Sequence, residues 1–256
     1  MLFFLHMENT PKALPGAWTL VVEAWKLFTS TWNASVKTSI YFLYVGLAVF
    51  AAALLTKLHG AFAFLEGIVG LVAGVAVVWI SIQLYQTMLN LEGGKRPLAP
   101  AEASKKAWTI FLPFFLVSIL VGLATLGGII LFILPGIYLA IAFSFSQMIL
   151  VDKGTRGTQA LAASRALVRG RWWETFWRLL VGGIVFGLLI GLVVGIPTGI
   201  LGGIAGPEAM QTGYGRQIDP VVNGTIMLIH YVVQAAFMPL MVGFTVKVYR
   251  ALQKTR

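Results

Sequence analysis

Six stretches of the sequence are apolar for about as long as a helix needs to cross a bilayer, which takes about 20 residues. Backbone groups inside lipid must be hydrogen-bonded within the segment, and for apolar stretches of this length that favours helices. We therefore predict an all-α membrane protein with six transmembrane helices, of which the third is the shortest and has Pro113 near its start. The expected spans are roughly 36–56, 62–89, 108–126, 129–151, 176–204 and 221–247.

The composition agrees with a bilayer as the surroundings of this chain. Only 11% of the residues are charged and 58% are hydrophobic, whereas soluble domains average about 25% charged residues. The net charge of +10 could suggest nucleic acid, but the basic residues lie between apolar runs and form no polar domain, so we expect no nucleic-acid role. The absence of cysteine excludes disulfides, thiol catalysis and cysteine-ligated zinc.

The distribution of Lys and Arg predicts the orientation of the six spans. With both termini in the cytoplasm, 17 of the 19 basic residues fall on the inner side, and only Lys57 and Arg216 fall on the outer side. Such an excess follows the positive-inside rule. We expect a multi-pass protein of the cell inner (plasma) membrane. Met1 and Met7 are both candidate starts, and residues 1–6 are excluded from the fold argument.

Short amphipathic segments precede alternate spans. The first, around residues 16–30, places Trp18, Val21, Val22, Trp25 and Phe28 on one helical face, as in helices that lie in the membrane interface. Similar segments at 100–108 and 158–170 precede the third and fifth spans. This predicts three transmembrane hairpins, each preceded by an interfacial helix. The repeats would be about 13–89, 97–151 and 156–250, within a single polytopic membrane domain over residues 1–256.

Glycine recurs at every fourth position of the fifth span. Small residues let helix backbones approach closely in lipid, so we expect the row to pack against neighbouring helices of the bundle. Four residues advance about 400°, so the row winds around its helix, and two different partners are expected, on either side of Pro197. A pore lined by glycine is the alternative. The row consists of Gly183, Gly187, Gly191, Gly195, Gly199 and Gly203.

Residues suited to catalysis are sparse in the predicted spans. None of the nine acidic residues lies near the middle of a span, and no cluster of His, Asp and Glu has metal-ligand spacing. Ion coupling or membrane chemistry needs ionisable groups at depth. We expect no enzyme, no cofactor, no metal and no catalytic residue.

Two groups of polar or basic residues are candidate sites. His230 and Gln234 share a helical face near mid-depth and could line a polar cavity with Asn223, Ser144 and Gln147; the alternative is that they bond neighbouring helices. The second group is typical of headgroup depth and indicates an anionic-lipid site. The alternatives are an interface anchor, or a structural clamp in which the arginines pair with Asp152, Glu174 and Glu102. The members of this group are Arg165, Arg169, Arg171, Trp172 and Trp173, with Gly170 expected to end the helix before them.

Parts of the sequence are similar to a known family. The stretch LPGIYLAI (134–141), the pair Val151-Asp152, the stretch ALAASRALVRGRWW (160–173) and the ending PLMVGFTVKVYRALQ (239–253) resemble the bacterial glycerophosphoryl diester phosphodiesterase membrane domain and related six-span families. The resemblance implies a six-span membrane fold. It implies no catalytic residue, because the soluble phosphodiesterase barrel of some members has no counterpart here.

Three functions remain open at this stage. The first is a non-enzymatic protein that handles lipid or small solutes as a transport or accessory component. The second is a scaffold or regulator that binds partners through its basic cytoplasmic face, and the third, which the sequence disfavours, is a membrane-embedded enzyme acting on phospholipid headgroups. The expected partners are membrane lipids, chiefly anionic ones, and an oligomer is neither implied nor excluded.

Overall fold

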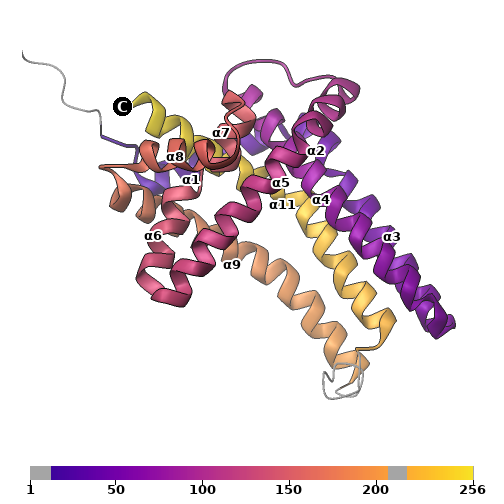
Figure 1. The fold of residues 1–256 in the computed structure, drawn as a ribbon. Helices are drawn as coiled ribbons and strands as arrows, with labels where there is room; N and C mark the ends of the chain where they lie inside the picture. Colours follow the sequence, from indigo (N-terminus) through magenta and orange to yellow (C-terminus); the bar gives the residue numbers. More distant parts are fainter. Residues whose placement is uncertain (1–12, 207–217, 256) are drawn as a thin grey trace, which may run out of the picture.

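A computed structural model describes residues 13–206 and 218–255, and within these ranges all regular structure is helical. Figure 1 shows the helices in chain order. They are α1 (Ala17–Ser30), α2 (Trp32–Ser39), α3 (Tyr41–Leu58), the 3₁₀ turn η1 (Gly60–Phe62), α4 (Ala63–Glu92), α5 (Pro100–Leu131), α6 (Ile133–Phe143), α7 (Ser146–Lys153), α8 (Gly157–Val168), α9 (Trp172–Ala205) and α11 (Pro220–Lys254).

The described chain contains six helical segments that are long and apolar enough to cross a membrane, which confirms the predicted number. They are Trp32–Leu58, Gly60–Glu92, Pro100–Leu131, Ile133–Lys153, Trp172–Ala205 and Pro220–Lys254. The third is longer than expected, because the amphipathic segment 100–108 continues directly into the span as one helix, α5. Proline suits the first helical position, and no Gly or Pro interrupts α5 before Pro113.

The short helices α1, α2, α7 and α8 gather at one end of the molecule (Figure 1). There α4, α7 and α11 end, α5 and α9 begin, and α1, α2 and α8 lie nearby. We call this the basic end, because Lys95, Lys153 and Lys254 lie in or beside these termini. At the opposite end, Lys57 forms an ion pair with Asp219, the residue that caps α11. The hydrogen bond from Lys57 holds the pKa of the Asp219 carboxyl below its ordinary value.

The tightly packed core lies around α11 and toward the basic end. Tyr249, Phe145 and Leu20 are fully buried there, contributed by α11, the α6–α7 junction and α1. By contrast, Leu71, Ile130 and Ile204, near the opposite ends of their helices, remain largely exposed. Lipid provides a suitable surrounding for such side chains and no hydrophobic drive to bury them. The basic end is therefore the part of the molecule where close packing shapes the surface.

Helix α1 buries only part of the apolar face expected from the sequence. Leu20, Val21 and Phe28 are buried in the core, whereas Trp18 and Trp25 are exposed. The predicted apolar face therefore divides into a protein-facing part and an outward aromatic part. Large aromatic rings with a polar N–H suit the boundary between apolar and polar surroundings.

The glycine row of α9 does not pack within the described chain. A Cβ atom placed at any of the six row positions would meet no neighbouring atom within 4 Å. The close approach in α9 occurs instead at Gly182, where a Cβ atom would lie 2.2 Å from the ring of Phe244 on α11. Helix α9 also continues through Pro197. The groove expected along the row is therefore not filled by a helix of the described bundle.

Candidate functional site

The span formed by α6 and α7 is broken near its basic end, and α8 packs against the break. At Ser144 and Phe145 the helix is interrupted. Ser164 of α8, which is fully buried, donates a hydrogen bond from Oγ to the Ala142 carbonyl at 2.8 Å and accepts one from the Phe145 amide at 3.2 Å. The Ser164 hydroxyl thus bonds backbone groups beside the break and fixes α8 against this span.

The orientation of Ser164 turns the next residues of α8 outward. Arg165 and Arg169 are exposed and lie one helical turn apart. Helix α8 ends at Val168, and Gly170 follows with φ +83°, a backbone conformation that favours glycine. The prediction that Gly170 ends this helix is confirmed. The chain then turns and begins α9 at Trp172.

An open groove of about 640 Å³ lies between α6 and α8. Two aromatic residues of α6, Tyr138 and Phe143, form one side, and the outward face of α8 forms the other. The α8 side contributes Thr158, Leu161, Ala162, Arg165, Ala166 and Arg169. The groove therefore combines two guanidinium groups with an aromatic and aliphatic surface.

The carboxylates that could neutralise these arginines are engaged elsewhere or form no ion pair with them. Asp152 pairs with Arg250, and Glu174 lies near Arg178. Within the described ranges, neither Arg165 nor Arg169 lies within 4 Å of a carboxylate oxygen. The structural clamp considered above is therefore not formed by these two arginines. Their charges face the groove without a compensating anion from the described chain.

The other three headgroup candidates lie beside the groove rather than in it. Trp172 stacks on Tyr138 with ring centroids 5.7 Å apart and donates from Nε1 to the Tyr138 carbonyl at 3.2 Å. Trp173 is exposed and packs edge-on against Trp172. Trp172 thus holds the start of α9 against the aromatic side of the groove. Arg171 points toward the C-terminal helix, where Nη1 donates to the Thr255 hydroxyl.

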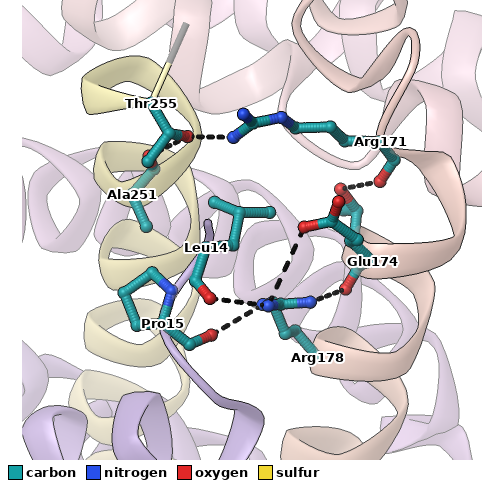
Figure 2. Close-up of polar contacts among 8 residues, drawn as sticks. Leu14, Pro15, Arg171, Glu174, Arg178, Ala251 and Thr255 are labelled. Carbon is teal, nitrogen blue, oxygen red and sulfur yellow. Dashed lines mark hydrogen bonds and ion pairs between the residues drawn. The ribbon is translucent and has the colours of Figure 1, made fainter. Parts of the chain in front are cut away.

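Arg171 belongs to a set of polar contacts that joins the two ends of the chain to α9, as Figure 2 shows. Below it, Arg178 donates to the backbone carbonyls of Pro15 at 2.8 Å and Leu14 at 2.9 Å, and to the Glu174 carbonyl at 2.7 Å. These bonds fix the segment before α1. The sequence did not predict these partners of Arg178, because they lie 163 and 164 positions away.

A second ion pair at the basic end was also missed from the sequence. Arg250 binds Asp152 through two parallel hydrogen bonds of 2.9 and 3.0 Å, and the Tyr249 hydroxyl donates to Asp152 at 2.8 Å. The contact joins α7 to α11. The resemblance had marked Asp152 as a family position without a partner, and the structure assigns it this bridging role.

Of the five polar-cavity candidates, two line one space among the described residues. His230 and Gln234 line a space of about 150 Å³ between α9 and α11, whose other lining residues are apolar. Ser144 donates to the Ile141 carbonyl, and Gln147 donates to the Ser118 hydroxyl at 2.7 Å. Asn223 does not line the space either. Gln147 thus follows the alternative interpretation, a bond to a neighbouring helix, because its amide reaches α5.

Within the described part of the chain, no group of three or more His, Asp or Glu side chains could hold a metal ion. Comparisons with protein-family models, curated proteins and solved structures found no match. The family resemblance therefore remains a prediction, and the groove between α6 and α8 is the candidate site on its geometry alone.

Proposed function

We propose that this protein is a non-enzymatic component of a bacterial inner membrane that binds anionic phospholipid headgroups in the groove between α6 and α8. The observation that carries the proposal is the pair Arg165 and Arg169, exposed on the groove and without a carboxylate partner in the described chain. Guanidinium groups bind phosphate through paired, charge-assisted hydrogen bonds.

The surroundings of the two arginines support a lipid rather than a free anion. Tyr138, Phe143 and Leu161 give the groove an apolar side, which suits the glycerol and upper acyl region of a lipid. Trp172 and Trp173 lie next to it, and Trp is enriched at the headgroup level of membranes. Among the described residues, no carboxylate or imidazole lines the groove. We therefore propose retention or transfer of lipid rather than cleavage.

The proposal includes an orientation in the membrane. The basic end lies in the cytoplasm together with both termini, and α1 and α8 lie in the inner interface beside three transmembrane hairpins. The charge distribution supports this arrangement. The inner leaflet is anionic and attracts each nearby Lys or Arg by about 1 kcal/mol, so Arg165 and Arg169 would meet the lipids they suit.

Native mass spectrometry of the full chain, purified in mild detergent, tests the proposal. We expect anionic lipid to remain bound to the unmodified protein. The double variant Arg165→Gln with Arg169→Gln should reduce the bound fraction about tenfold or more, since each charged hydrogen bond lost costs about 1.5–3 kcal/mol.

The matched control removes the same charge from another exposed site at the basic end. Lys105→Gln with Lys106→Gln, on the first turns of α5, should retain the lipid. Equal lipid retention in the arginine variant and the unmodified protein would refute the proposal. A bound protein in place of lipid would support the scaffold function instead.

A further inference from the structure

The space of about 150 Å³ between α9 and α11 shares no lining residue with the groove between α6 and α8. Most of its lining is apolar, and Met238 and Met241 of α11 contribute flexible thioether side chains, which adapt to ligands of varied shape. An apolar cavity of about this size holds a molecule as large as benzene. The other apolar lining residues are Ile190, Val194, Val233 and Phe237.

His230 and Gln234 are the polar residues of this described lining, and both are exposed rather than buried. The His230 Nδ1 atom lies 2.8 Å from the Ile226 carbonyl oxygen. Because a carbonyl oxygen only accepts, Nδ1 carries the hydrogen, and Nε2 of the neutral ring is left as an acceptor. The Gln234 side chain forms no hydrogen bond within the described ranges. The cavity therefore offers a ligand one imidazole acceptor and one amide, which both donates and accepts.

The position of this polar pair along α11 restricts the ligand. Helix α11 is one of the candidate membrane spans and begins at Pro220. At about 1.5 Å per residue, His230 lies about 15 Å along the helix, roughly halfway through a hydrocarbon core of about 30 Å. A charged group is costly at that depth. A phospholipid headgroup therefore does not suit this cavity, whereas an uncharged lipid with a hydrogen-bonding group does.

The glycine row of α9 lies on the same side of the cavity as Gln234. Ile190 and Val233 line the cavity from the two helices, and Gly191 and Gln234 follow them directly, about 100° further around each helix. Because α9 runs away from the basic end and α11 runs toward it, these equal rotations turn toward the same side. A Cβ atom at Gly191 would meet no neighbouring atom within 4 Å. The row thus forms a shallow exposed surface along which an acyl tail fits.

We propose that this cavity binds the head of an uncharged lipid that carries a hydroxyl group, with the lipid tail along the glycine row of α9. The hydroxyl donates to Nε2 of His230 and accepts from the amide of Gln234. Diacylglycerol and a membrane quinol both carry this chemistry. Because the site and the ligand differ from those of the groove between α6 and α8, the two proposals stand or fall separately.

Photo-crosslinking of the full chain in phosphatidylcholine nanodiscs tests the proposal. The probe is a long-chain alcohol with a diazirine beside the hydroxyl, and the reference is its methyl ether, which cannot donate a hydrogen bond. We expect the alcohol to form adducts at Met238 and Met241, mapped by mass spectrometry, with a yield about tenfold above that of the ether. Competition by unlabelled diacylglycerol or by a quinol identifies the source of the hydroxyl.

Two variants make the test specific. The double variant His230→Leu with Gln234→Leu changes exposed residues and should lower the yield of alcohol adducts about tenfold. Thr225→Val is the control and should keep the yield, because Thr225 donates to the Val221 carbonyl of the same helix and does not line the cavity. Equal yields for the alcohol and the ether, an unchanged yield in the double variant, or competition by neither lipid would overturn the proposal.

Discussion

Single residues set the closest helix contacts in this bundle, and glycine occupies several of those positions. Gly182 lies against the Phe244 ring, and Gly128 faces Gly136 across the turn between α5 and α6, where an added Cβ atom would be 2.8 Å from the Gly136 Cα. Such distances leave no space for a side chain. The Gly182 contact lies in the core, whereas the Gly128–Gly136 contact closes the turn between α5 and α6.

The contrast between Gly182 and the row beside it gives a prediction. Gly182→Ala should destabilise the detergent-solubilised protein by about 1–3 kcal/mol, because the new methyl group overlaps a buried ring. Gly191→Ala should have little effect on the single chain or stabilise it slightly, since no atom lies near that position. Thermal unfolding followed by tryptophan fluorescence compares the two. A larger loss for Gly191→Ala would show that the row packs after all.

The glycine row illustrates what a sequence pattern omits. The four-residue spacing of the glycines is present in the sequence, but the spacing identifies neither the partner helix nor the side of α9 that the bundle covers. Gly182 was the important position, and its partner Phe244 is 62 residues away. By contrast, the role of Gly170 could be predicted, because a glycine after a short amphipathic segment is a local signal.

At the level of helices, the break between α6 and α7 organises the candidate site. Ser164 bonds its backbone groups, and Asp152 at the end of α7 is tied to Arg250 and Tyr249 of α11. The groove is shaped by elements that are fixed at both ends of α7. The six spans could be predicted because hydropathy is a local property, whereas these bridges join residues about 20 to nearly 100 positions apart and leave no local signal.

The bridge from Asp152 predicts a stability effect. Asp152→Asn should lower stability by about 1–3 kcal/mol, because the partly buried Arg250 loses a charged, two-point partner. Glu102→Gln serves as control, since Glu102 is exposed and forms no ion pair among the described residues. Apparent melting temperatures in the same detergent give the comparison. Equal melting temperatures for the two variants would show that the Asp152–Arg250 bridge does not stabilise the fold.

At the scale of the whole molecule, packing and charge are distributed unequally between the two ends. The basic end contains most of the core, the helices α1, α2, α7 and α8, and the groove between α6 and α8, whereas the opposite halves of α4, α5 and α9 expose apolar side chains. A lipid bilayer would cover those halves and leave the basic end in the headgroup region. Recognition of lipid headgroups is the role that we propose for that end.

Orientation is the first whole-molecule prediction. Reporter fusions after Arg216 and after Arg256 should report opposite sides of the membrane, outside and inside, because α11 lies between them and basic residues favour the cytoplasm. The compartment-specific activity of the reporters is the measurement. If both fusions report the same side, α11 does not span the membrane.

The central claim is that the groove between α6 and α8 holds an anionic lipid, and a single introduced cysteine tests it directly because the chain has none. Ala162 lines the groove, whereas Gln159 is exposed on the same helix outside the groove lining. The rates of maleimide labelling of Ala162→Cys and Gln159→Cys are measured in phosphatidylglycerol and in phosphatidylcholine nanodiscs. The account predicts slower labelling at position 162 alone in phosphatidylglycerol, with the difference lost when Arg165 and Arg169 become Gln. Equal rates at position 162 in the two lipids, or equal slowing at both positions, would contradict it.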